Sequence, residues 1–250
     1  MTENERGRHG CRLIFDIDVK FDTLVKLDSP VKDLFNGARQ SFQAGIWRTT
    51  MAGVRQFDEG EMLDKALALF WKKGYADTSM QELAAATGVQ RGSLYNAYQD
   101  KETLFLRVFE VYAARFLEGA RRTLEAPRLD QALEAFFAYV IASMTTGTPT
   151  RGCLSTKTAV AGDRIDEPIR QALAAMLDRF EAVLAARLAQ PDPELEPSVP
   201  AKEAAALIIT FTRGIVVIER VYQEPRRLHD NARTLVAMLL RPRRAAAAPA

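Results

Sequence analysis

The sequence has few of the residues that build disulfide or metal frameworks. Its 250 residues include two cysteines, Cys11 and Cys153, and two histidines, His9 and His229. Two widely separated cysteines do not form the dense pattern of a disulfide-rich secreted domain, and neither histidine stands at a metal-ligand spacing. We therefore predict no metal and no cofactor, and we expect the reducing cytoplasm as the compartment.

Long hydrophobic runs are missing too. The longest apolar stretch, residues 204–221, is interrupted by Arg213, Glu219 and Arg220, so we predict no membrane span. Residues 1–10 are polar, and residues 13–19 contain Asp16 and Asp18, a pattern unlike that of a secretory signal peptide.

A strong excess of one charge is also absent. The chain has 34 Lys and Arg against 32 Asp and Glu, a net charge of +2, so bulk electrostatics does not indicate a nucleic-acid partner. Any such indication has to come from a motif. Apolar residues, in contrast, make up 48% of the chain, which is enough for the core of one large domain or two small ones.

Residues 1–50 differ from the rest of the chain. Residues 13–27 alternate between apolar and polar, Pro30, Gly37 and Gly45 follow, and no helical period is sustained. This pattern fits weak strands, a disordered N-terminal extension, or an artefact of an upstream start codon, because Met51 stands just before the first recognisable helix.

From residue 58 onward the sequence predicts an all-α protein. Apolar residues recur three and four positions apart, with Asp58 and Asp100 as N-caps and almost no strand signal. The predicted helices cover residues 58–74, 79–87, 90–97, 101–124, 130–144, 153–161, 167–189, 202–222 and 228–240, and the breaks between them include Pro127, Pro149, the prolines of 191–200 and Pro225. We expect a DNA-binding domain over 51–101, a helical ligand-binding and dimerisation domain over 102–241, joined to it by the long 101–124 helix, and a disordered tail over 242–250.

The segment 80–98 has the spacing of a helix-turn-helix. Ala84 is small enough for two short helices to cross closely, and Gly88 supplies the positive φ that the turn needs. Leu83, Val89 and Leu94 are predicted to hold the pair from inside. The second helix then turns an outward face of polar side chains to a major groove about 12 Å wide.

Residues over about 57–105 resemble the DNA-binding domain of the TetR family of transcriptional regulators. The matching residues are Gly74-Tyr75, Thr78-Ser79, Leu83-Ala84, Gly88-Val89, Arg91-Gly92-Ser93-Leu94-Tyr95, Tyr98 and Lys101-Glu102-Thr103-Leu104. The resemblance implies a homodimer that binds double-stranded operator DNA. It also implies regulation by a small-molecule inducer, whose identity the sequence does not give.

Carried over position by position, the resemblance implies a set of DNA contacts. Gln90, Arg91, Ser93 and Asn96 would contact bases or phosphates, Thr78 and Tyr95 would contact phosphates through their hydroxyls, and Lys101 would contact phosphate at a helix N-terminus. The competing interpretation is that the helical pair only packs and that Arg91 and Lys101 are solvated; for Tyr98 we favour a place in the core. The 51–101 segment holds six basic and seven acidic residues, so affinity should depend on a few well-placed cations and on two subunits acting together.

The predicted helix 202–222 is apolar nearly all round, with Gly214 permitting close backbone approach, and so must be buried on two sides. The resemblance implies a four-helix dimer bundle formed with the 228–240 helix. Burial within one chain is the alternative.

Two features of the C-terminal half bear on ligand binding. Several apolar residues on the middle helices could line a ligand cavity, although most such residues are core: Phe116, Phe137, Met144, Met176, Phe180 and Phe211. Cys153 follows Gly152 at an expected helix start near Arg151 and Lys157, which would lower its pKa, and it resembles the cysteine of electrophile-sensing TetR-like proteins. We favour the alternative that Cys153 is a small buried core residue.

The leading hypothesis is therefore a ligand-responsive DNA-binding regulator, a repressor released from a near-palindromic operator by a small molecule or an electrophile. A constitutive DNA-binding protein without a ligand is the alternative. An enzyme built on the helical bundle is disfavoured, because the sequence has no Glu-x-x-His pair, nucleophile elbow, phosphate loop or dinucleotide fingerprint.

Overall fold

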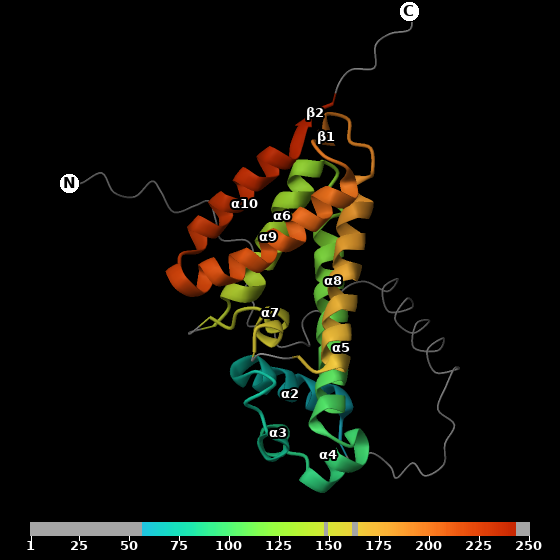
Figure 1. The fold of residues 1–250 in the computed structure, drawn as a ribbon, viewed down its shortest axis with the longest axis vertical. Helices are drawn as coiled ribbons and strands as arrows, with labels where there is room; N and C mark the ends of the chain where they lie inside the picture. The colour runs from blue at the N-terminus through green and yellow to red at the C-terminus, as the bar shows by residue number, and fades with distance from the viewer. Residues whose placement is uncertain (1–56, 148–149, 162–164, 244–250) are drawn as a thin grey trace, which may run out of the picture. The chain divides into compact units, whose positions relative to one another are not determined.

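The computed structural model describes residues 57–147, 150–161 and 165–243. The expected extension over 1–50, Cys11 and the expected tail beyond residue 243 lie outside this part of the chain. Within it the chain forms helices joined by short connections and one two-stranded antiparallel sheet (Figure 1). The elements are α2 (Glu59–Lys73), α3 (Met80–Thr87), α4 (Arg91–Tyr98), α5 (Lys101–Thr123), α6 (Leu129–Thr145), α7 (Leu154–Ala159), α8 (Glu167–Leu188), β1 (Leu195–Pro197), α9 (Ala201–Tyr222), α10 (Pro225–Leu239) and β2 (Leu240–Pro242). The predicted all-α class is confirmed.

Local side-chain bonds set several helix starts. An Asp58 carboxylate oxygen accepts a hydrogen bond from the Glu61 amide at 2.9 Å, and Asp100 accepts one from the Thr103 amide at 2.7 Å. These bonds satisfy amides that the first turn of a helix leaves without partners, and both predicted caps are confirmed. Pro225, predicted as a break, is instead the first residue of α10. A proline is tolerated there because that position needs no amide donor.

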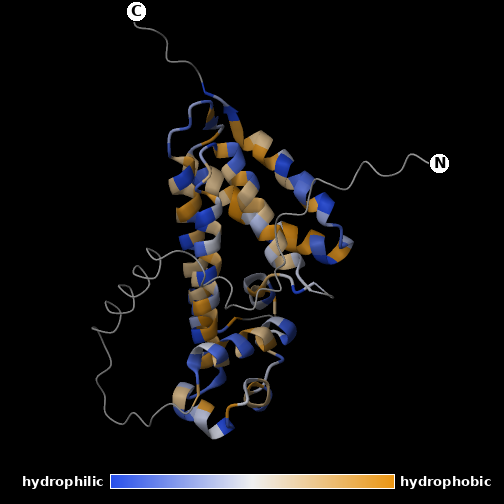
Figure 2. Cartoon of the chain, turned by 180° about the vertical axis from the view of Figure 1, so that it is seen from behind, coloured by the Kyte–Doolittle hydropathy of each residue, from blue (hydrophilic) through white to orange (hydrophobic). Residues whose placement is uncertain are grey.

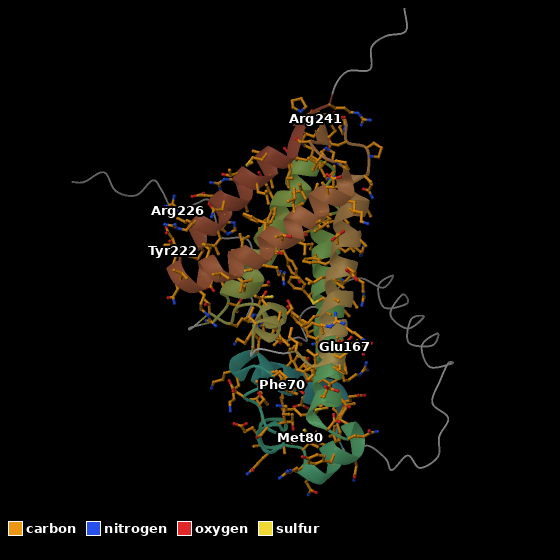
Figure 3. All side chains as sticks on the ribbon, viewed as in Figure 1. Phe70, Met80, Glu167, Tyr222, Arg226 and Arg241 are labelled. Atoms are coloured by element: carbon orange, nitrogen blue, oxygen red, sulfur yellow. The ribbon has the colours of Figure 1, made fainter. Side chains whose placement is uncertain are left out.

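The C-terminal half contains two short strands that were not predicted. β1 pairs with β2 so that Leu195 lies opposite Pro242, although residue 242 was expected to begin the unstructured tail. The Arg241 guanidinium, labelled in Figure 3, donates to Glu196 at 2.9 Å across this pair. Strands of three residues are too short to show an alternating pattern, so no sequence pattern indicates them.

Helix α5 connects the two halves of the described chain. Helices α2 and α4 pack against its N-terminal part, and α6 and α8 pack along the remainder (Figure 1). Helix α9 packs on α8, and α10 packs on α6. With 23 residues, α5 is about 35 Å long at ~1.5 Å per residue, so it spans both halves as predicted.

A continuous row of aromatic rings follows the buried face of α5. Phe70 of α2 meets Phe105 at a centroid distance of 5.1 Å, and successive rings continue at 5.8, 5.7 and 5.9 Å through Phe109, Tyr112 and Phe116. Phe116 then meets Phe180 of α8 at 5.3 Å. We call these six residues the aromatic row. Each contact at such distances contributes about 0.5–1.5 kcal/mol beyond area burial, so the row stabilises the connection between the halves.

Gly119 sets the approach of α6 to α5. The Tyr139 hydroxyl of α6 donates to the Phe116 carbonyl at 3.2 Å, and a Cβ at position 119 would overlap the hydroxyl end of that tyrosine. Tyr139 also meets the Phe116 ring at 5.4 Å. The glycine is therefore required for close packing here and not for backbone freedom.

The described helices include none that is both long and apolar enough to cross a membrane. Hydrophobic residues instead recur on the helix faces that pack together, with further hydrophobic segments along α9 and α10 (Figure 2).

Gly119→Ala should destabilise the protein by about 1–3 kcal/mol. Overpacking against Tyr139 and loss of its hydrogen bond outweigh the roughly 1 kcal/mol gain in helix propensity. Gly92→Ala in α4 is the matched control, since no atom lies within 4 Å of the added Cβ, and it should be neutral or stabilising. Urea unfolding of both variants measures the difference, and equal effects would refute the steric account.

Candidate nucleic-acid interface

A capping box positions helix α3. The Glu82 amide donates to the Ser79 hydroxyl at 3.2 Å, and the Ser79 amide donates back to the Glu82 carboxylate at 2.9 Å. Hydrogen bonds from Lys73 and from Ser79 lower the pKa of Glu82 to about 2. The carboxylate is therefore ionised at neutral pH. Its negative charge lies near the N-terminus of α3 and interacts favourably with the positive end of the helix dipole.

The turn between α3 and α4 has the geometry that the sequence predicts. Gly88 has a φ of 72° in the left-handed region, and its amide donates to the Ala84 carbonyl at 3.0 Å. The three interior residues predicted to hold the pair, Leu83, Val89 and Leu94, are all buried. The helix-turn-helix is therefore present as predicted.

The exposed face of α4 carries most of the predicted contact residues. Arg91, Tyr95 and Asn96 are exposed, Ser93 is half-buried, and Gln90 lies exposed at the N-cap. The Arg91 guanidinium donates to the Tyr95 hydroxyl at 3.3 Å and lies 5.4 Å from the centre of its ring. This face presents donors and acceptors that can reach base edges or phosphates.

Thr78 is buried in this structure, and the phosphate contact implied for it stays a prediction. Its side chain is 2% exposed, and its hydroxyl donates to the Gly74 carbonyl at 2.6 Å. The exposed neighbour Ser79 stands at the N-cap of α3 instead. The Ser-x-x-Glu pattern was the sequence signal that could have distinguished the two positions.

Lys101 is an anchor within the chain. Its ammonium group donates to the carbonyls of Tyr75 at 2.9 Å and Ala76 at 3.3 Å, and it lies 4.4 Å from the centre of the Tyr75 ring. An ammonium has three N–H donors, so one remains for the predicted phosphate contact. Tyr98 is buried, as favoured from the sequence, and its hydroxyl donates to Glu59 at 3.1 Å.

Cys153 lies in a polar cluster at the start of α7. Its thiol is buried, with the sulfur 3.1 Å from the Ser155 hydroxyl and 3.6 Å from a guanidinium nitrogen of Arg213. Burial raises the pKa of the thiol, but the Arg213 charge and hydrogen bonds with Ser155 and Thr156 outweigh it, so the pKa is lowered overall. The basic partner is therefore Arg213 of α9, whereas Arg151 and Lys157, expected from the sequence, contact Trp71.

The predicted pocket residues form packed core in this structure. Phe116, Phe137, Met144, Met176 and Phe180 are buried and Phe211 is half-buried. Phe137 meets Phe211 edge-on at 5.7 Å, so these two rings pack against each other. A ligand site lined by them stays a prediction that requires them to move.

The structure also contains a pocket and a buried carboxylate that were not predicted from the sequence. A pocket of about 210 Å³ lies between α6 and α10, lined by Glu134, Phe137, Ala138, His229, Ala232 and Arg233.

Glu219 of α9 is 2% exposed, and neither of its carboxylate oxygens has a hydrogen-bond partner. Buried unpartnered carboxylates are costly, so Glu219 is unusual in this core. Within the described residues, no group of three or more His, Cys, Asp or Glu side chains could hold a metal ion.

Helices α9 and α10 expose an apolar stripe. Leu207, Val217 and Val221 of α9 are 51%, 57% and 67% exposed, and Met238 of α10 is 72% exposed. Gly214 lies on the same face of α9, with no atom within 4 Å of an added Cβ. We call these five residues the α9 stripe. The other described residues do not cover it, which disfavours burial of α9 within the described part of the chain. Figure 3 labels Tyr222 and Arg226, on either side of the α9–α10 turn next to the stripe.

A helix-turn-helix with an exposed polar second helix, joined by a long helix to a mostly helical half, is typical of DNA-binding regulators. The chain belongs to the TetR family of transcriptional regulators. Residues 62–108 match the family described as bacterial regulatory proteins, tetR family, and residues 130–235 match the tetracyclin repressor-like C-terminal domain. The resemblance stated from the sequence is confirmed.

Relatives and solved structures agree with this assignment. The chain is 36% identical over 99 residues to the HTH-type transcriptional repressor ComR of Escherichia coli, a match that covers 39% of this chain and 47% of ComR. It is 35% identical over 77 residues to the HTH-type regulator YezE of Bacillus subtilis, covering 31% of this chain and 40% of YezE. The matches thus span less than half of either relative.

Solved structures share the fold over most of the described chain. The reduced form of E. coli NemR superposes with a TM-score of 0.68 at 17% identity, covering 74% of this chain and 98% of NemR. A cysteine mutant of the TetR-family regulator CifR in complex with a 26-bp operator DNA superposes with a TM-score of 0.63 at 24% identity, covering 73% of this chain and 97% of CifR.

Arg91→Ala and Lys101→Ala should have different effects. Arg91 is exposed on α4, so its loss should change base preference by about 1–3 kcal/mol at one operator position and leave the melting temperature unchanged. Lys101 ties α5 to the α2–α3 turn, so its loss should lower the melting temperature and weaken binding to all sequences alike. Binding to a library of operator variants, with thermal unfolding alongside, separates the two. A Lys101→Ala variant of normal stability with altered base preference would contradict this assignment.

Proposed function

We propose that the protein is a ligand-responsive transcriptional repressor that binds a near-palindromic operator as a homodimer. The exposed polar face of α4 carries this proposal, because Arg91, Tyr95 and Asn96 lie on a short helix held by buried residues on its opposite face. That arrangement suits insertion into a major groove. The CifR complex with operator DNA supports this use of the shared fold.

The dimer is supported by the α9 stripe. In a two-fold symmetric dimer the same surface of both copies meets, so Val217 and Val221 of one copy would pack against α9 and α10 of the other. Gly214 would let the two α9 backbones approach closely. Two recognition helices would then reach half-sites about 34–36 Å apart or somewhat more.

Val217→Lys should convert the dimer into a folded monomer. A two-fold axis would bring both lysines into an apolar interface, and operator affinity should fall by a factor of about 100 or more, because one half-site contributes few phosphate contacts. Val160→Lys is the matched control, because Val160 is exposed at the end of α7, outside the stripe. Sedimentation velocity gives the oligomeric state, and footprinting on the DNA upstream of the chain's own gene gives operator binding.

The proposal fails if the wild-type protein is monomeric at micromolar concentration and protects no specific sequence. A Val217→Lys variant that remains dimeric would place the interface elsewhere and leave the DNA-binding part of the proposal standing.

Release from DNA is proposed to follow a change at the C-terminal half, caused by a small molecule or by an electrophile at Cys153. The lowered pKa of the thiol raises its thiolate fraction. With an α,β-unsaturated carbonyl, the sulfur would bond to the β-carbon, the C=C π bond would break, and the α-carbon would take up the proton that the thiol gave up. Solved structures of this fold include the reduced form of NemR and a cysteine mutant of CifR.

Cys153→Ser should retain operator binding but resist release by such an electrophile. Serine keeps a hydroxyl near Ser155 and Arg213, so the fold should be preserved, while the nucleophile is lost. Footprinting with and without the electrophile, together with the measured thiol pKa, tests this. If the variant releases DNA as the wild type does, or if the thiol titrates near 8.5 or above, the inducer is non-covalent and Cys153 is core.

A further inference from the structure

We propose that residues 150–157, here called the connector, link α2 of the DNA-binding half to α9 of the dimerisation half. The connector contacts Trp71 of α2 on one side and Arg213 of α9 on the other. The inference deepens the proposed function and rests on it, since it assigns the route by which the C-terminal half controls the recognition helices.

On the DNA-binding side, three contacts converge on Trp71. Its indole N–H donates to the Gly152 carbonyl at 3.0 Å, and the Arg151 guanidinium lies 4.1 Å from the centre of its ring. The Lys157 ammonium donates to the Trp71 carbonyl at 2.6 Å. Trp71 is in the last turn of α2, where carbonyls lack intrahelical donors and a cation is favoured by the helix dipole. The connector therefore holds both the side chain and the backbone of this residue.

The connector is itself held in one conformation. Gly152 has a φ of 67°, in the left-handed region that favours glycine, and its amide donates to the Met144 carbonyl at 2.9 Å. The Arg151 amide donates to the Thr146 carbonyl at 2.9 Å, and the Arg151 side chain donates to the Ser143 carbonyl at 2.8 Å. These bonds use carbonyls at the C-terminal end of α6, so the Gly152 carbonyl that faces Trp71 is fixed relative to α6.

On the dimerisation side, two arginines of α9 bind the connector. The Arg213 guanidinium donates to the Ser155 hydroxyl at 2.9 Å and the Thr156 hydroxyl at 3.3 Å, in addition to its contact with Cys153. Arg220 donates to the Thr150 carbonyl at 3.4 Å. Residues seven apart lie two turns along one face of a helix, so both arginines point toward the connector. Val217 and Val221 of the same helix are exposed in the stripe.

Helix α9 thus bears the proposed dimer contact on one face and the connector on another. A movement of α9, or a new group on Cys153, would displace Ser155 and Thr156 and so alter the position of Gly152 and Lys157. Because these two residues hold Trp71, the end of α2 would shift, and α3 begins seven residues after α2 ends. The half-site spacing of a dimer tolerates little such displacement.

The test is a double-mutant cycle between the two sides of the connector. Trp71→Phe removes the indole hydrogen bond and keeps a ring beneath Arg151, while Arg213→Met removes the bonds to Ser155 and Thr156. Each variant should bind operator about fivefold or more weakly. The double variant should lose much less than the product of the two losses, with a coupling factor of about fivefold or more. Arg179→Met, an exposed residue of α8, is the control and should combine with Trp71→Phe additively.

A second readout does not involve DNA. Arg213→Met should accelerate hydrogen exchange of the amides at the end of α2 and in the α2–α3 turn, whereas Arg179→Met should not. If the wild type binds no operator while this exchange effect is present, the proposed function fails and the connector stands. If operator binding is normal but the cycle is additive and the exchange is unchanged, the connector is refuted. Should Arg213→Met fail to fold, Arg213→Lys keeps the charge while losing the forked geometry, and the same two readouts apply.

Discussion

The structure depends on the buried aromatic face of α5. The aromatic row runs from Phe70 in α2 through four rings of α5 to Phe180 in α8, with neighbouring centroids 5.1–5.9 Å apart. Because the interior is close-packed, a tilt of α5 at one end is resisted by rings along its whole length. The helix-turn-helix is therefore supported by the same core as the C-terminal helices, and its orientation is a property of that core.

In the proposed function, this support lets a DNA-binding unit of nearly balanced charge be selective. With a nearly balanced charge over 51–101, binding has to come from few contacts that are placed accurately, and from two copies acting together. In the proposed function, the polar face of α4 supplies these contacts, and the α9 stripe pairs the two copies. Trp71 lies beside the aromatic row, where its ring meets Tyr112 at 5.1 Å. Through Trp71 the connector therefore contacts the middle of the row, so hydrogen bonds as well as apolar packing link the two halves.

Structural features that depend on residues close together in the chain could be predicted from the sequence. The caps Asp58 and Asp100, the positive φ of Gly88 and the exposed face of α4 all follow from patterns within a few positions. What could not be predicted depends on distant contacts. The Arg213 partner of Cys153 is 60 residues away, and the Gly152 partner of Trp71 is 81 residues away. The burial of Thr78 could not be predicted for a related reason, since it is decided by how α2 and α3 pack and not by the residue type.

The most direct measurement of the central claim, that packing fixes the recognition helices relative to the dimerisation half, is the distance between two spin labels in the dimer. Labels would be placed at exposed Ala86 of α3 in each copy, with Cys11 and Cys153 replaced by serine, and measured by electron–electron double resonance with and without operator DNA. We expect a single narrow distance distribution in the free protein that operator DNA leaves unchanged. A broad distribution that narrows only when DNA binds would contradict the claim, because the DNA and not the protein would then set the spacing.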